Sequence, residues 1–245
     1  KYKFKVNKTY IVRLREKLFL NNEFFGKCNP KSSTGRLDIF CRTIVDYSDE
    51  YEKIPYGYNG EIFLEITPRS FDIEFVEGNK LNQVRLIYKR HNDINDKKII
   101  DINKKFFKNN LINYKNISNG LKISVNLEGT DSIIAYRARK KTPAINFSKI
   151  QFYKPSNYWE PLKSANKKLV IEKNRFYILK SKEKISIPNG YAGEMVPYDT
   201  GIGDFRAHYA GFFDPGFGIP GGSYAVLEVK TNEIPFILED GQTIA

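Results

Sequence analysis

The chain has 245 residues, 41% of them hydrophobic, with 16 Tyr and 18 Phe, so it can form one large or two small domains with buried cores, and global disorder is excluded. The formal net charge is +12, yet Lys and Arg are scattered along the chain, and we interpret this charge as a solvated surface rather than a nucleic-acid-binding face. No apolar run approaches the roughly 20 residues of a membrane span, so no membrane partner is expected.

The first 90 residues predict a series of short strands. Alternating apolar residues place strands at 1–20, 37–45, 60–66, 71–75 and 81–88. An acidic segment at 46–53 and a segment rich in Gly, Tyr and Pro at 54–60 are predicted to be turns. Short strands with frequent turns are typical of a barrel or a sandwich.

The β pattern continues after a polar interruption. Residues 91–119 are rich in Lys and Asn and predict a long insertion or linker. Alternation returns at 121–127 and 133–137. An aromatic segment at 152–161 contains the single tryptophan, Trp159, which we expect to pack across a junction rather than to bind a ligand.

The segment Asn29–Asp38 has the composition of an anion-binding loop. It presents Lys31, the adjacent hydroxyls of Ser32 and Ser33, a glycine, and Arg36. Hydroxyl donors, backbone N–H groups and two cations can converge on one polyphosphate. The segment lacks the spacing of a P-loop, so we expect a loop without a helix N-terminus. A solvated turn is the alternative, because Ser-Ser-Thr-Gly is also ordinary loop composition.

The opening pattern of the chain returns in its second half. Tyr10, Glu16, Gly26 and Pro30 have counterparts 167 residues later, at Tyr177, Glu183, Gly193 and Pro197. Leu64-Glu65-Ile66 matches Leu227-Glu228-Val229 at an offset of 163. Because an internal duplication is the simplest explanation, we predict a first repeat at residues 1–90, an insertion or linker with additional strands at 91–165, and a second repeat at 166–245.

The two repeats differ where a ligand would bind. The counterpart of Lys31–Arg36 is Tyr198–Gly203, which has lost both cations and gained Asp199. This second loop should repel a polyphosphate. The second repeat has instead a dense motif at 205–218, which contains Arg206, His208, Ala210 and Asp214.

Cysteine usage and the ends of the sequence indicate a cellular setting. Cys28 and Cys41 fit neither a disulfide framework nor a zinc site, and no signal-peptide pattern is present. We therefore expect a reduced, cytoplasmic protein. The sequence begins at Lys1 inside an alternating run and stops near an apolar run, which we interpret as a fragment of a longer protein.

These motifs resemble those of the deoxycytidine triphosphate (dCTP) deaminases, a family of the dUTPase-fold superfamily. The resemblance rests on Lys31-Ser32-Ser33 with Arg36, on the strand ending in Leu64-Glu65-Ile66, and on residues 210–217 with Val226-Leu227-Glu228. The duplicated layout resembles the two-domain form of the enzyme. It implies an all-β fold of two tandem, distorted antiparallel, jelly-roll-like β barrels with few short helices, usually assembled as a homotrimer with active sites at subunit boundaries.

The resemblance also implies an activity, the hydrolytic deamination of dCTP to dUTP and ammonia in pyrimidine deoxynucleotide synthesis. Lys31, Ser32 and Ser33 would hold the phosphates, which carry Mg²⁺, Arg36 would lie near the reacting water, and Glu65 would be the catalytic carboxylate. In the second repeat Glu228 carries over as the carboxylate. The substrate-binding candidates there are Arg206, His208, Ala210 and Asp214, with His208 structural or substrate-positioning rather than catalytic.

Deamination by water needs a proton acceptor. Zinc deaminases use a metal held by His and Cys in an H-x-E…P-C-x-x-C signature, whereas this chain has two His and no C-x-x-C, so no zinc is expected. A carboxylate must then serve as general base. Glu65 lies in an apolar strand, which suits that role, and a solvated strand carboxylate is the alternative. Arg36 could polarise the water, or form a structural ion pair with Asp38 or Asp46.

Other interpretations stay open beside deamination. Hydrolysis of dUTP asks for an aspartate in the nucleoside-binding hairpin, where the first repeat has Pro55 and the second keeps Asp214 without a phosphate loop. A duplicated β scaffold that binds nucleotides without catalysis is a second alternative. Within the deaminase interpretation, the loop of the first repeat and Glu228 of the second could form a composite site, and the sequence does not choose between Glu65 and Glu228.

Overall fold

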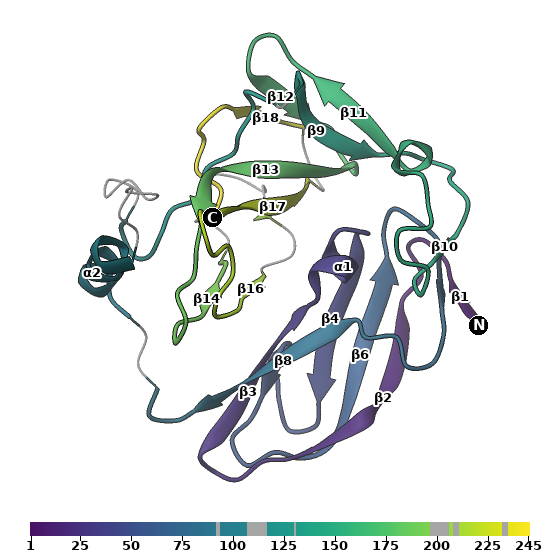
Figure 1. Cartoon of the computed structure of the whole chain (residues 1–245). Helices are drawn as coiled ribbons and strands as arrows, with labels where there is room; N and C mark the ends of the chain where they lie inside the picture. The colour runs from purple at the N-terminus through teal and green to yellow at the C-terminus, as the bar shows by residue number, and fades with distance from the viewer. Residues whose placement is uncertain (92–93, 107–116, 130, 197–205, 208–210, 232–234) are drawn as a thin grey trace. The chain divides into compact units, whose positions relative to one another are not determined.

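The computed structural model describes residues 1–91, 94–106, 117–129, 131–196, 206–207, 211–231 and 235–245. Strands dominate these residues, and the helices are few and short, which confirms the predicted all-β class (Figure 1). The chain divides into two compact units, Lys1–Asn92 with Arg139–Trp159, and Asp93–Ala138 with Glu160–Ala245. Among the described residues, the helices are too short or too polar to cross a bilayer.

The first unit contains three small sheets, with strand orders β1-β7-β10, β2-β6-β4 and β5-β3-β8. The pairs are antiparallel, except that β10 joins β7 in parallel. The elements are β1 (Tyr2–Phe4), β2 (Tyr10–Phe19), β3 (Phe24–Pro30), α1 (Ser32–Gly35), β4 (Ile39–Val45), β5 (Lys53–Ile54), β6 (Asn59–Pro68), β7 (Ile73–Phe75), β8 (Asn82–Tyr88), β10 (Ile145–Asn146) and the 3₁₀ turn η2 (Pro155–Asn157).

Alternation along β6 shows how the sequence builds this unit. Ile62, Leu64 and Ile66 are buried, whereas Phe63 and Glu65 between them are half-buried on the opposite face. A strand that buries every second residue has one face against a core and one face available for other contacts. Glu65 therefore lies on the face opposite the core, as its alternation predicts.

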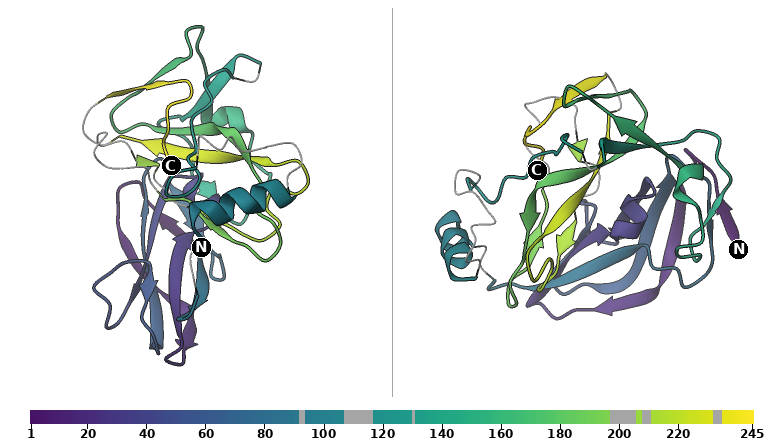
Figure 2. Two further views of the ribbon diagram at one scale, coloured as in Figure 1. Left: turned by 90° about the vertical axis from the view of Figure 1, so that its left-hand side faces the viewer. Right: turned by 45° about the horizontal axis from the view of Figure 1, so that its top comes forward.

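The second unit contains a five-stranded sheet in the order β11-β9-β13-β17-β15 and two ribbons, β12-β18 and β14-β16. Figure 2 shows the chain in two further views, with most of the strands of this unit coloured green to yellow. Its largest fully buried side chains include Tyr177, Leu127, Ile171, Leu227 and Leu238. The elements are α2 (Asp96–Phe106), β9 (Ile133–Ala138), β11 (Trp159–Lys163), β12 (Lys168–Ile171), β13 (Phe176–Ile185), β14 (Gly193–Glu194), β15 (Arg206–Ala207), β16 (Phe212–Phe213), β17 (Ser223–Lys230) and β18 (Phe236–Glu239).

The central strand pairs of the two units have the same register. In the first unit Ile11 pairs with Glu65, and the β2–β6 ladder shifts between Arg13 and Lys17. In the second unit Ile178 pairs with Glu228, and the β13–β17 ladder shifts between Lys180 and Lys184. Every one of these positions corresponds at the offsets of 167 and 163 found in the sequence. A shared register with a shared bulge is what the predicted duplication requires.

The structure differs from the sequence-based expectations in two places. The strand expected over 1–20 is broken at a turn, where Asn7 takes a left-handed φ of 59°. The loop expected at Ser32 contains a single helical turn, α1. In both cases a backbone hydrogen bond decides, from Asn7 N to the carbonyl of Pro68 and from Gly35 N to that of Lys31. Within the segment expected to be an insertion or linker lies α2.

Candidate functional site

The predicted phosphate loop begins where β3 ends. The backbone N–H of Lys31 donates to the carbonyl of Leu81 at 2.9 Å. Thr34 is fully buried, and its hydroxyl donates to the same carbonyl at 2.6 Å. Thr34 therefore anchors the turn to the segment that precedes β8. Nothing in the sequence separates this hydroxyl from its two serine neighbours, so sequence reasoning missed its role.

The other side chains of the turn face outward. Ser32, Ser33 and Arg36 are exposed, and Lys31 is half-buried. No side chain caps the start of α1, and the first N–H groups of a helical turn have no partner within it. Hydroxyls, N–H groups, an ammonium and a guanidinium therefore lie on one surface turn, which suits an anion such as a phosphate.

Asp38 lies just after this turn, on its buried side. It is 1% exposed and takes a left-handed φ of 54°. The hydroxyl of Ser70 donates to its carboxylate at 2.6 Å, and the N–H of Arg69 donates to its carbonyl at 2.8 Å. Asp38 thus ties the end of the loop to the segment after β6.

Glu65 is held by an arginine that sequence reasoning did not single out. Arg42 lies opposite Glu65 in the β4–β6 ladder, and its Nη2 donates to Glu65 Oε1 at 2.8 Å. The guanidinium also lies 3.6 Å from the ring centre of Tyr51 and 4.8 Å from that of Phe40. A ligand that used Glu65 Oε1 would compete with this packed guanidinium.

A second carboxylate, Glu52, lies in a polar cluster of the first unit. Asn82 Nδ2 donates to Glu52 Oε2 at 3.3 Å, and Thr43 Oγ1 accepts from the same amide at 2.6 Å. Burial raises the pKa of the Glu52 carboxyl. Burial also raises the pKa of Cys28 to about 12 and that of Cys41 further, so both cysteines are unreactive thiols.

Glu228 occupies in the β13–β17 ladder the register position that Glu65 occupies in the β2–β6 ladder. It is 5% exposed and lies on the face of β17 opposite the core residues Leu227 and Val229. Lys230, two residues further on the same face, is also 5% exposed. Buried charges of this kind are paired or used for function. Glu228 is thus more deeply buried than Glu65, which is half-buried on β6.

The structure describes the remaining predicted residues only in part. The backbone of Arg206 pairs with Lys230, while its side chain, His208 and Ala210 lie outside the described residues, as does the loop at 198–203. Asp214 is exposed, and its carbonyl accepts from Phe217 N at 3.0 Å in a turn. The backbone of Arg206 on β15 thus lies beside β17, the strand that carries Glu228.

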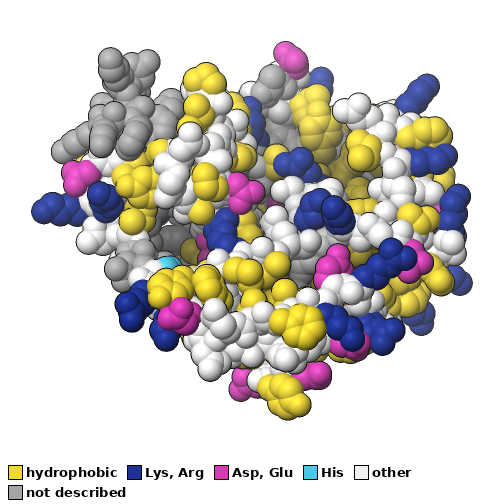
Figure 3. All heavy atoms as spheres, turned by 60° about the horizontal axis from the view of Figure 1, so that its bottom comes forward, with side chains coloured by type: hydrophobic (Ala, Val, Ile, Leu, Met, Phe, Trp, Pro, Cys, Tyr) yellow, Lys and Arg dark blue, Asp and Glu magenta, His cyan; other side chains and the backbone are white. Residues whose placement is uncertain are grey.

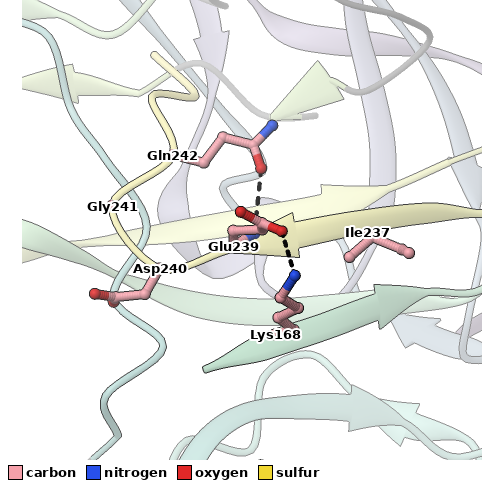
Figure 4. Close-up of a pocket in the computed structure, with 6 residues that line it drawn as sticks. All are labelled: Lys168, Ile237, Glu239, Asp240, Gly241 and Gln242. Atoms are coloured by element: carbon pink, nitrogen blue, oxygen red, sulfur yellow. Dashed lines mark hydrogen bonds and ion pairs between the residues drawn. The ribbon is translucent and has the colours of Figure 1, made fainter. Parts of the chain in front are cut away.

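A pocket of about 550 Å³ lies away from these residues, beside the β12–β18 ribbon (Figure 4). There Lys168 Nζ donates to Glu239 Oε1 at 2.6 Å, and Gln242 Oε1 accepts from Glu239 N at 3.2 Å. Gly241 takes a left-handed φ of 80°, which forms the turn between them. Lys168, Glu239 and Gln242 are engaged with one another, and Asp240 accepts from Lys182, so the pocket offers few groups to a ligand.

Charged side chains of both signs are interspersed on one face of the molecule. On the face shown in Figure 3, Lys and Arg side chains stand among acidic and hydrophobic ones. Within the described residues, no group of three or more His, Cys, Asp or Glu side chains has a geometry that could hold a metal ion. The donors and cations of the Lys31–Arg36 turn suit phosphate oxygens.

Comparison with known proteins identifies the fold and the family. Residues 3–90 match the model of the 2'-deoxycytidine 5'-triphosphate deaminase N-terminal domain, and residues 95–245 match that of the C-terminal domain. A crystal structure of 2'-deoxycytidine 5'-triphosphate deaminase from Agrobacterium tumefaciens is 40% identical, with a TM-score of 0.92 over 99% of this chain and 73% of that one. No curated protein matches.

The strands and the two candidate carboxylate faces therefore define a protein of the dUTPase-like β fold. Within that class, the chain belongs to the 2'-deoxycytidine 5'-triphosphate deaminase family. The resemblance carried by Lys31–Arg36, Glu65 and Glu228 is thereby confirmed at the level of the family.

Proposed function

We propose that this protein catalyses the hydrolytic deamination of dCTP to dUTP and ammonia. The observation that carries the proposal is the family match across both halves of the chain, together with 40% identity to a solved dCTP deaminase. The outward-facing hydroxyls and cations of the Lys31–Arg36 turn agree with a triphosphate substrate.

The phosphate loop belongs to the first repeat. Lys31, Ser32 and Ser33 are proposed to bind the phosphates, and Arg36 to lie near the reacting water. Mg²⁺ enters this proposal as part of the nucleotide, where it would neutralise phosphate charge. The protein groups at the turn are donors and cations, so they complement the phosphates and leave the metal to the phosphate oxygens.

The catalytic carboxylate is proposed to be Glu228 rather than Glu65. Glu228 is buried, whereas Glu65 is half-buried and accepts from Arg42.

The chemistry assigned to Glu228 is proton transfer. Its carboxylate would take a proton from water as the oxygen attacks C4 of cytosine, and would pass this proton to N3. A second proton would then move from the new C4 hydroxyl to the amino group, so that the C4–N bond breaks, the C4 carbonyl forms and ammonia leaves. A general base of this kind contributes about 10²–10⁴-fold to the rate. Burial of the Glu228 carboxylate excludes competing water and strengthens each hydrogen bond that it makes with the reacting ring.

Ammonia release from dCTP and Mg²⁺ tests the proposal, with Glu228→Gln and Glu65→Gln as matched variants. We expect Glu228→Gln to lower kcat by about 10²–10⁴-fold while dCTP still binds. Glu65→Gln should retain turnover, because Arg42 can still donate to the amide oxygen. Loss of activity in Glu65→Gln alone would reverse the assignment, and wild-type protein that binds dCTP without releasing ammonia would leave a nucleotide-binding scaffold as the better account.

Pyrophosphate release in the same samples tests the alternative chemistry. The substrate dUTP should yield no pyrophosphate if the protein is a deaminase alone. Release of pyrophosphate from dUTP would indicate a bifunctional enzyme or a dUTP diphosphatase, and an Asp214→Asn variant would then show whether the only aspartate of the hairpin motif activates the water.

A further inference from the structure

Arg69 lies just beyond the end of β6, on the face of the β2-β6-β4 sheet that carries Glu65. Its backbone N–H donates to the carbonyl of Asp38 at 2.8 Å, which extends the register of the β4–β6 ladder by one position. Because side chains alternate along a strand, Glu65, Thr67 and Arg69 lie on the same face. Arg69 is half-buried there.

The register places Asp38 opposite Arg69, yet the carboxylate of Asp38 is directed into the protein. A side chain opposite Arg69 on a regular strand would lie on the same face as Arg69. Asp38 instead takes a left-handed φ of 54°, is 1% exposed, and accepts from the hydroxyl of Ser70 at 2.6 Å. Among the described residues, no carboxylate lies within ion-pair distance of the Arg69 guanidinium.

Two guanidinium groups flank the ring of Phe40. That of Arg42 lies 4.8 Å from the ring centre, and that of Arg69 lies 5.9 Å from it. The charge of Arg42 is balanced by Glu65, to which its Nη2 donates at 2.8 Å. An aromatic ring attracts a cation through its quadrupole but carries no net charge. Phe40 therefore attracts the Arg69 guanidinium without neutralising it.

The Lys31–Arg36 turn leads directly to this place. Asp38 follows Arg36 by two residues, and its N–H donates to the carbonyl of Gly35 at 2.9 Å. Residues paired across a ladder have Cα atoms about 5.5 Å apart, and consecutive Cα atoms are about 3.8 Å apart, so the Cα atoms of Arg36 and Arg69 are no more than about 13 Å apart. Long side chains from the turn and from Arg69 can therefore meet along one phosphate chain.

We propose that Arg69 binds the terminal phosphates of a nucleotide whose phosphate chain lies on the Lys31–Arg36 turn, and that it makes this site selective for triphosphates. A guanidinium presents a planar fork of N–H donors that matches two oxygens of a phosphate. The binding of a phosphate chain rests on the geometry of β4 and β6. Its assignment to the substrate dCTP rests on the proposed function.

Binding of inorganic tripolyphosphate to the full chain, measured by titration calorimetry, tests the contact. Arg69→Gln should weaken binding by about tenfold or more, the effect of one charge-assisted hydrogen bond. Arg13→Gln is the matched control, because Arg13 pairs with Phe63 in the β2–β6 ladder, about 20 Å along the strand from Arg69, and forms an ion pair with Glu61 at 3.5 Å. It removes the same charge and should stay within about twofold of wild type.

Two further measurements separate a lost contact from a disturbed fold. Arg69→Lys keeps the positive charge and should bind tripolyphosphate at least about threefold more tightly than Arg69→Gln. Trp159 lies 5.6 Å from Phe71, two residues after Arg69, so its fluorescence during urea unfolding reports whether the first unit stays folded in each variant. Equal losses in Arg69→Gln and Arg13→Gln, equal binding by the Gln and Lys variants of Arg69, or no binding by wild type would overturn the proposal.

Comparison of dCTP with dCMP tests the selectivity. A contact with a phosphate that does not react stabilises substrate and transition state equally, so Arg69→Gln should raise the KM for dCTP by about tenfold and leave kcat within about twofold. Binding of dCMP, which lacks the terminal phosphates, should change by less than about twofold. An equal loss for both nucleotides would overturn the selectivity for triphosphates. If the protein releases no ammonia, calorimetry with dCTP and dCMP still decides the contact, so failure of the function and failure of the contact are separate outcomes.

Discussion

At the scale of single residues, Glu52 shows how surroundings decide the state of a carboxyl. Its backbone takes a left-handed φ of 62° and is fixed on both sides, by donation to the carbonyl of Thr43 at 3.2 Å and by acceptance from Cys28 N at 2.7 Å. The side chain lies in a partly buried position beside Asn82. Desolvation by burial outweighs the hydrogen bonds and raises the pKa of Glu52.

This shift predicts how stability depends on pH. The folded state binds the Glu52 proton more tightly than the unfolded state, whose carboxyl titrates near 4.5. The free energy of unfolding should therefore fall as pH rises from 4.5 through the raised folded-state pKa. Glu52→Gln removes this dependence, and we expect the variant to gain stability relative to wild type as pH rises. Urea unfolding between pH 4 and 8 measures the difference.

The exposed residue Glu50 provides the control for that experiment. Its side chain is 59% exposed and pairs with Lys53 on the surface, so Glu50→Gln should change the pH profile little. If the free energy of unfolding of Glu52→Gln changed with pH in parallel with that of wild type, a raised pKa of Glu52 in the folded state would be contradicted.

At the scale of elements, the two bulged strand pairs reach the same register by different chemistry. In the second unit the buried hydroxyl of Ser181 donates to the carbonyl of Glu183 at 2.7 Å and accepts from Ala225 N at 2.8 Å. At the matching position the first unit has Leu14, which packs against an apolar cluster that includes Tyr58. A bulge leaves ladder groups unpaired, so a hydroxyl can satisfy them where an alkyl group cannot.

Removal of that hydroxyl should destabilise the second unit. Ser181→Ala leaves the buried N–H of Ala225 without its acceptor, at a cost of about 1–3 kcal/mol in the free energy of unfolding. Ser186→Ala is the matched control, because the buried hydroxyl of Ser186 has no hydrogen-bond partner in the part of the chain that the structure describes. Thermal unfolding compares the two variants. An equal effect of both would contradict a specific role for Ser181 at the bulge.

At the scale of the whole molecule, the first unit is assembled from two separate stretches of chain. Residues 139–159 complete it, because β10 adds to β7 and because Phe71 contacts both Tyr158 and Trp159. The ring centres of Phe71 and Trp159 are 5.6 Å apart in an edge-to-face arrangement. Trp159 thus packs within the first unit, at the point where the chain passes to the second.

This arrangement makes Trp159 a built-in reporter of the first unit. Phe71 is 1% exposed, and Phe71→Ala should lower the free energy of unfolding by about 3–5 kcal/mol. Fluorescence of the single tryptophan during urea unfolding measures this loss. Phe152→Ala, at a position 62% exposed, is the control with a small expected effect. A loss below about 1 kcal/mol in Phe71→Ala would mean that the contact adds little, in contrast to other buried aromatic residues.

Much of the fold follows from local pattern. Alternation places the strands near 37–45, 60–66 and 81–88, because a strand that buries one face must repeat every second residue. Offsets of 167 and 163 along the chain align Glu65 with Glu228, and the family resemblance rests on those same residues. The left-handed turn at Asn7 was not predictable, because a hydrogen bond to the distant Pro68 holds it.

The sequence by itself determined the β class, the two matching carboxylates and the loop that suits phosphate, because these depend on residue type and spacing along the chain. Only the tertiary structure decided that Arg42 donates to Glu65 and that Thr34 anchors the loop. These contacts join residues from different strands, and the partner of a side chain across a sheet follows from register, which local composition does not contain.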